Sequence, residues 1–195
     1  MGKIYYIIGK SSSGKDTIFK ELLSRIPELK QVVPYTTRPR REGEKDGVEY
    51  FFTDEKRTEE LERAGRIIEL RAYDTACGVW KYFTADDGQI DLETGNYLMI
   101  GTLESYEKMV QYYGAENILP LYIEVEDGER LSRALARERE QAQPKYKELC
   151  RRFLADEEDF SKEKLRRLGI ERRFRNEDKE HCLEEITEVI YNGKL

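Results

Sequence analysis

The stretch that most constrains the fold is Gly9-Lys10-Ser11-Ser12-Ser13-Gly14-Lys15-Asp16-Thr17. It follows the apolar run 4–8, which predicts a buried strand, and precedes residues 17–25, whose apolar spacing predicts a helix. Strand, glycine-bounded loop and helix are the context of a phosphate-binding P-loop, where backbone N–H groups and the positive helix end surround an anion. We therefore predict that residues 9–17 bind phosphate, with the Lys15 ammonium on the terminal groups. The alternative is a Gly/Ser loop that only caps a helix.

Asp16 departs from the usual P-loop pattern, because a serine or threonine normally stands there and contacts magnesium. A carboxylate binds a hard divalent cation directly or through water, so Asp16 is our candidate metal ligand. Its negative charge near the phosphates also increases the need for a metal ion.

Composition limits the classes of function. A chain of 195 residues is long enough for one domain with a large core and an inserted lobe. The net charge of −6 argues against a general nucleic-acid binder, and the apolar runs are too short to span a membrane. The single histidine, His181, argues against a His-based triad or metal site, and we expect it on a surface helix. Cys77, Cys150 and Cys182 are widely spaced and odd in number, which favours a reducing, cytoplasmic setting.

A second polar stretch, residues 35–52, carries Arg38, Arg40 and Arg41 between prolines and glycines. Guanidinium forks grip phosphate bidentately, so we interpret this stretch as an anion clamp. A flexible basic loop is the alternative, although the stretch runs directly into aromatic residues.

Apolar strands alternate with helices along the chain, which predicts an α/β fold with a parallel sheet. We predict strands over residues 3–8, 29–33, 67–72, 79–83, 96–100, 118–125 and 170–174. We predict helices over residues 17–25, 54–64, 103–113 and 149–160, from 127 onward, and at the C-terminus after Asn176. Glu69 lies inside one strand and either serves a site or simply faces water. The arginine-rich helices after residue 127, broken at Pro144, form either a lid over a charged site or solvated helix faces.

Together these residues resemble the guanylate kinase family. That family carries the signature T-T-R-x-P-R-x-G-E-x-[DN]-G-x-[DE]-Y, and only Arg40 breaks it here. The matching residues are Thr36, Thr37, Arg38, Arg41, Gly43, Glu44, Asp46, Gly47, Glu49 and Tyr50. The resemblance implies a P-loop nucleoside monophosphate kinase fold, with a parallel sheet core, an inserted small β-lobe and a helical lid. It assigns the core to residues 1–33, 84–126 and 161–195, the acceptor lobe to 34–83 and the lid to 127–160.

The resemblance also implies the site residues and the ligands, ATP, Mg²⁺ and GMP. The ATP site would comprise Gly9, Lys10, Ser11, Ser12, Ser13, Gly14, Lys15, Asp16, Thr17 and Asn176, with Asp16 on the metal. The GMP site would comprise Thr37, Arg38, Arg41, Tyr50, Glu69, Gly78 and Thr102, with Glu69 accepting from guanine. Catalysis would fall to Lys15, Arg38, Arg137 and Arg152.

Two departures concern the base end of the acceptor site. The family has a Tyr-Gly-Ser/Thr turn where this chain has Cys77-Gly78-Val79, and it has acidic residues where this chain has Gly101-Thr102-Leu103. The expected reaction is phosphoryl transfer from MgATP to GMP. The alternatives are a ribose 1,5-bisphosphate kinase of the same fold, or a non-catalytic guanylate-kinase-like binding module. We expect small-molecule nucleotides as partners, with no nucleic acid, membrane or obligate protein partner.

Overall fold

The computed structural model describes residues 2–75 and 78–195 and contains two sheets. The larger sheet has the strand order β2-β7-β1-β8-β9, and every pairing in it is parallel. Its strands are β1 (Ile4–Ile8), β2 (Lys30–Gln31), β7 (Tyr97–Ile100), β8 (Ile118–Glu124) and β9 (Phe174–Arg175). All five residues of the central strand β1 are buried, because helices cover both faces of the sheet.

Two hydrophobic clusters form the core, one on each face of the larger sheet. Tyr5 and Ile7 of β1 pack against α1 (Lys15–Arg25) and α7 (Lys179–Asn192). The alternate side chains of β1 pack on the opposite face against α3 (Leu103–Tyr113) and residues near α6 (Lys162–Arg167). The short 3₁₀ helix η1 (Ala115–Asn117) leads into β8. The alternation of a strand thus explains how one apolar run supplies both clusters.

The second sheet has the order β4-β3-β6-β5 and is mostly antiparallel. Its strands are β3 (Tyr35–Thr36), β4 (Phe51–Phe52), β5 (Ile67–Thr75) and β6 (Gly78–Ala85), with α2 (Glu55–Arg63) packed beside them. Tyr35 stacks on Phe83 with ring centroids 5.1 Å apart. This small cluster gives the second sheet a core of its own.

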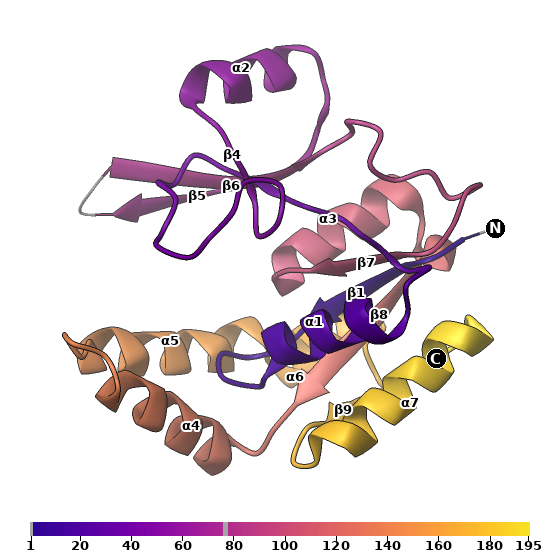
Figure 1. The fold of residues 1–195 in the computed structure, drawn as a ribbon. Helices are drawn as coiled ribbons and strands as arrows, with labels where there is room; N and C mark the ends of the chain where they lie inside the picture. The colour runs from indigo at the N-terminus through magenta and orange to yellow at the C-terminus, as the bar shows by residue number, and fades with distance from the viewer. Residues whose placement is uncertain (1, 76–77) are drawn as a thin grey trace.

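Helices α4 (Asp127–Arg139) and α5 (Tyr146–Asp159) form an arm on the other side of the core. In Figure 1 the second sheet lies above the core and this arm lies below it, and both extend toward the end where the loop before α1 lies. The loop that carries the P-loop sequence is therefore flanked by the two parts of the chain that are richest in candidate site residues.

Most predicted elements are present, with corrections at four places. The strand predicted over 170–174 is wrong except at its end, since Ile170 instead donates its N–H to the Leu165 carbonyl and packs beneath α6. Helix α6 itself was not predicted. The strand predicted over 29–33 is reduced to Lys30–Gln31, and the helix predicted from 149 begins at Tyr146.

Three further expectations concern single residues and membranes. His181 lies on α7 with most of its side chain exposed, as expected. Cys150 and Cys182 are free thiols, while Cys77 lies outside the described residues. No helix in the described ranges combines the length and apolar character needed to cross a bilayer.

Ile7 is the most direct test of this core, because it is fully buried at the centre of β1. We expect Ile7→Ala to lower the free energy of unfolding by about 3 kcal/mol, through lost burial and the cavity left behind. Leu154→Ala, at a leucine that is 69% exposed, should cost no more than about 0.5 kcal/mol. Urea denaturation with an unchanged m-value measures both, and equal losses would contradict the assignment of Ile7 to the core.

Candidate functional site

The loop between β1 and α1 curls as a phosphate-binding loop requires. Gly14 has φ +83°, and Ser12 has φ +63°. A Cβ atom on Gly14 would lie 2.4 Å from the Nδ2 atom of Asn176, so a side chain there would collide. The Ser13 N–H donates to the Lys10 carbonyl at 3.2 Å, which closes the turn.

Two buried donors hold carbonyl oxygens of this loop. Asn176 Nδ2 donates to the Ser13 carbonyl at 2.8 Å, and Arg130 Nη1 donates to the Ser11 carbonyl at 3.0 Å. Asn176 comes from the chain after β9, whereas Arg130 comes from α4. Elements that are distant in sequence therefore fix the loop from two sides.

Lys15 and Asp16 occupy the first turn of α1. The Lys15 Nζ atom lies 3.9 Å from Asp16 Oδ2, and the Asp16 side chain is 81% exposed. Lys15 lines a cavity of about 410 Å³ together with Tyr73 and Thr102 of other elements. Asp16 is also close enough to help raise the pKa of Tyr50, which is raised mainly by burial. The first turn of α1 thus faces the second sheet.

Asp16 offers one hard oxygen ligand. Among the described residues, no three His, Cys, Asp or Glu side chains are grouped to hold a metal ion. A single carboxylate still fits Mg²⁺ bound with a nucleotide, because Mg²⁺ takes its other ligands from phosphates and water. The donor set fits a metal that arrives with its nucleotide rather than a resident ion.

Arg38 is the most enclosed of the arginines predicted to bind phosphate, with only 3% of its surface exposed. Its two terminal nitrogens donate to the Glu44 carboxylate at 2.8 and 2.7 Å, and its guanidinium lies over the rings of Tyr50 and Phe52. Hydrogen bonding to Arg38 lowers the pKa of the Glu44 carboxyl to about 2. Glu44 and the aromatic rings therefore hold the Arg38 guanidinium in place.

Two buried side-chain atoms lack hydrogen-bond partners among the described residues, Ser13 Oγ and Arg38 Nε. Buried polar atoms are normally paired, so an unpaired one needs an explanation such as an absent ligand. One atom lies in the P-loop and the other in the predicted anion clamp. Both predicted phosphate sites thus contain an unsatisfied polar atom.

Tyr82 is a site residue that the sequence did not reveal. Its ring packs edge-on against Tyr50 and Tyr73, with centroids 5.7 Å away in each case. The pKa of Arg38 is raised mainly by its hydrogen bond to Glu44, and Tyr82 contributes as well. The alternation of Trp80 and Tyr82 along β6 was the available signal, because it places both rings on one face.

Other residues predicted to bind GMP have hydrogen-bond partners within the chain. The Thr37 Oγ1 atom accepts from the Lys81 N–H at 2.9 Å, and Thr102 caps α3 by accepting from the Ser105 N–H at 3.2 Å. Gly78 lies exposed at the start of β6 with φ +102°, and it lines neither the cavity of about 410 Å³ beside Lys15 nor the cavity of about 630 Å³ beside Ser12. The position of Gly78 therefore gives its assignment to the acceptor site no support.

Glu69 differs most from what the resemblance implies. Its side chain is only 1% exposed, and both oxygens are occupied. Oε2 accepts from Arg71 Nε at 2.9 Å, while Oε1 accepts from Arg71 Nη2 at 3.2 Å and from Thr84 Oγ1 at 2.9 Å. The carboxylate that was expected to read guanine already has partners within the protein.

The arm of α4 and α5 contacts the P-loop directly. Arg137 Nη2 donates to Ser12 Oγ at 3.3 Å. Arg137, Arg152 and Arg41 all line a cavity of about 630 Å³ that also includes Ser12. Arg152 is paired with Glu148 and is largely exposed. The structure therefore brings three predicted arginines, from the arm and the anion clamp, to one cavity beside the loop.

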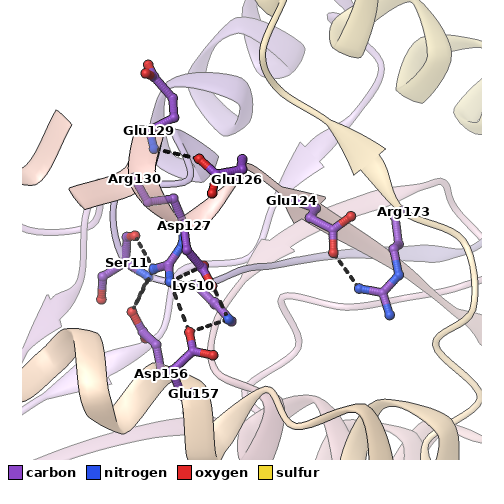
Figure 2. A network of polar contacts seen from close by, with 10 residues as sticks. All are labelled: Lys10, Ser11, Glu124, Glu126, Asp127, Glu129, Arg130, Asp156, Glu157 and Arg173. Carbon is purple, nitrogen blue, oxygen red and sulfur yellow. Dashed lines mark hydrogen bonds and ion pairs between the residues drawn. The ribbon is translucent and has the colours of Figure 1, made fainter. Parts of the chain in front are cut away.

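Figure 2 shows an ionic network at the base of this arm that the sequence did not predict. Arg130 is 1% exposed and contacts the carboxylates of Asp127, Asp156 and Glu157. Asp156 also accepts from the Ser11 N–H at 2.8 Å, and Lys10 bonds to Glu157. Lys10 belongs to the predicted ATP site, and its ammonium is joined to Glu157 of the arm.

Comparisons with known proteins agree with this arrangement. Residues 1–77 match the family model described as guanylate kinase. A guanylate kinase of Legionella pneumophila (strain Lens) is 40% identical over 68 residues, which is 35% of this chain and 32% of that protein. A guanylate kinase of Symbiobacterium thermophilum is 32% identical over 117 residues, 57% of this chain and 56% of that protein. The chain thus matches between about a third and about half of the length of these relatives.

The fold extends the likeness beyond the matched sequence. The crystal structure of guanylate kinase from Anaplasma phagocytophilum superposes with a TM-score of 0.70 at 19% identity. The superposition covers 100% of this chain and 87% of that one. At this identity the likeness concerns the fold alone.

The Arg38–Glu44 pair generates a prediction about pH. Because the pKa of Glu44 is lowered by folding, the pair stabilises the protein above the ordinary value of 4.5 and loses its effect as the pH falls toward 2. We expect Glu44→Gln to cost about 1–3 kcal/mol at pH 7, since it removes the carboxylate from a buried guanidinium. The difference in melting temperature between wild type and variant should shrink between pH 5 and pH 3. A difference that stays constant over that range would contradict the pairing.

Proposed function

We propose that this chain is a member of the guanylate kinase family and transfers the terminal phosphoryl group of MgATP to a nucleoside monophosphate. GMP, giving ADP and GDP, is the acceptor proposed from the signature at residues 36–50. The observation that carries the proposal is that each predicted phosphate site contains one buried atom without a hydrogen-bond partner among the described residues. These atoms are Ser13 Oγ and Arg38 Nε. A donor and an acceptor phosphate would give each atom a partner.

In this proposal the P-loop binds the phosphates of ATP. Residues 9–17 supply backbone N–H groups, and Asn176 keeps the Ser13 carbonyl turned away from the anion. The Lys15 ammonium and the Arg137 guanidinium, which already contacts Ser12, oppose the charge of the transferring group. Asp16 would hold Mg²⁺, which supplies charge neutralisation when it is bound with the nucleotide.

The second sheet would hold the acceptor phosphate. Arg38 is fixed by Glu44 and has a buried Nε atom without a partner among the described residues, and Tyr50 and Tyr82 lie beside its guanidinium. Arg41 and Arg152 line the cavity that also holds Arg137, so they can neutralise charge between the two phosphates. Positioning and electrostatic stabilisation suffice for this reaction, and no covalent enzyme intermediate is needed.

In this proposal, each of the three parts of the chain has its own role. Residues 34–83 form the acceptor lobe and residues 127–160 the lid, while the rest forms the ATP-binding core. Closure of the lid over the cavity would exclude water and so suppress hydrolysis of ATP.

Two other functions remain as alternatives. The pairing of Glu69 with Arg71 favours a kinase of the same fold that acts on a sugar bisphosphate, because such an acceptor has no guanine to read. A non-catalytic binding module is the third candidate, and the intact glycine and lysine residues of the P-loop argue against it.

The test is ADP release in a coupled assay with MgATP against GMP, dGMP, AMP, UMP, CMP and ribose 1,5-bisphosphate. We expect ADP release that depends on a nucleoside monophosphate. Turnover only with the bisphosphate would support the second candidate, and ATP binding without any acceptor-dependent turnover would support the binding module.

Lys15 tests the role of the P-loop. We expect Lys15→Ala to lower kcat by about 10²–10³-fold, because it removes a cation from the transferring phosphoryl group. Lys20→Ala is the matched control, since Lys20 lies exposed on the same helix. Thermal unfolding should show that both variants fold. Equal turnover in the two variants would remove Lys15 from the mechanism.

A further inference from the structure

Neither position at which the family is expected to read guanine offers a free carboxylate among the described residues. Glu69 is sealed by Arg71 and Thr84, as described above. At the end of β7, where the family has acidic residues, this chain has Gly101. A Cβ atom on Gly101 would lie 2.2 Å from the hydroxyl of Tyr6, which is itself bonded to Ser105 at 2.7 Å. Tyr6 therefore fills the space that a side chain at position 101 would need.

Arg71 is the charged group beside Glu69 on the same face of β5. Glu69, Arg71 and Tyr73 alternate along β5 and so point to the same face. Arg71 also donates from Nη1 to Thr102 Oγ1 at 3.2 Å. Thr102, which accepts from Arg71, and Tyr73, which follows Arg71 on the same face of β5, line the 410 Å³ cavity together with Lys15 and the carboxylate of Glu104 on α3.

Arg71 has hydrogen-bond donors to spare. A guanidinium has five N–H groups, and the bonds to Glu69 and Thr102 use three of them. The other two have no partner among the described residues, while 13% of the side chain is exposed. Burial disfavours the charged form, but Glu69 outweighs it and raises the pKa of Arg71, so the group stays cationic.

The face of β5 that carries Glu69 and Arg71 thus offers hydrogen-bond donors, whereas guanine needs hydrogen-bond acceptors there. Guanine donates from N1–H and from its 2-amino group, and those donors need an acceptor such as a carboxylate. Here they would have to displace Arg71 from Glu69, leaving a buried charge without its partner. An acceptor molecule that presents oxygen atoms instead would pair with the spare N–H groups of Arg71.

We propose that Arg71 is a specificity-determining residue, which blocks Glu69 and makes the site favour a phosphomonoester whose far end accepts hydrogen bonds over GMP. The proposal rests on the proposed phosphoryl transfer, and it replaces GMP, the acceptor proposed from the signature, with a molecule of this kind. Two sources supply such oxygens, the keto groups of a base such as xanthine or uracil, and a second phosphate on a sugar.

XMP and GMP form a matched pair for the test, because XMP carries a keto oxygen where GMP carries the 2-amino group. Calorimetry without ATP measures the dissociation constants of GMP, XMP, UMP and ribose 1,5-bisphosphate. For the wild type we expect XMP, UMP or the bisphosphate to bind at least about tenfold more tightly than GMP, as expected when a buried polar group finds or loses its partner. Tighter binding of the bisphosphate than of both nucleotides would identify the second phosphate as the source.

Arg71→Ala should raise the ratio of the XMP dissociation constant to the GMP dissociation constant about tenfold, because Glu69 is released and can then accept from guanine. Arg71→Gln is the second variant, since it keeps a side-chain donor for Glu69 and is more certain to fold. Arg63→Ala is the matched control, at an arginine on α2 that is 74% exposed and paired with Glu59. The control should leave the ratio unchanged.

The outcomes separate this proposal from the proposed function. Tightest binding of GMP by the wild type, an unchanged ratio in folded Arg71 variants, or no binding by any of the four ligands would overturn the role of Arg71. Binding with the expected ratio, but without ADP release once MgATP is added, would overturn phosphoryl transfer and leave the specificity assignment standing.

Discussion

A loop that binds an anion through its N–H groups must turn its carbonyl oxygens away and find them partners. In this chain the partners come from outside the loop, since Arg130 bonds to the Ser11 carbonyl and Asn176 to the Ser13 carbonyl. Both donors are buried, so losing either would leave a carbonyl oxygen without its partner in a low-dielectric setting. The geometry of the site therefore depends on α4 and on the chain after β9 as much as on the loop itself.

The same constraint couples the arm to the loop. Arg130 satisfies a loop carbonyl and balances Asp127, Asp156 and Glu157 at once, while Asp156 in turn accepts from the Ser11 N–H. Moving α5 would separate these charges and release a loop N–H group. The position of the α4–α5 arm and the conformation of the loop are thus linked by a single buried guanidinium. Under the proposed function, this link would couple nucleotide binding to closure of the arm.

The sequence predicted the fold well where one periodicity dominated. The apolar run 4–8 could only be a buried strand, and the helix at 103–113 was predicted with its observed bounds. Prediction failed near the C-terminus, where Ile170 is apolar because it packs under α6 rather than because it lies in a strand. Short strands such as β9 are held by pairing with β8, and no local pattern records that.

For the site, the sequence by itself determined which residue types are available: a glycine-bounded loop with Lys15, an arginine clamp after Thr36, and arginines on α4 and α5. The spacing of residues along the sequence reveals these motifs, because the curvature of a loop and the alternation of a strand depend on residues that are close together in the chain. Only the tertiary structure decided which charges neutralise one another. It joined Glu69 to Arg71, Lys10 to Glu157 and Tyr82 to the Arg38 environment. Such pairing depends on side-chain burial and on contacts between elements far apart in the chain, and a sequence pattern carries neither.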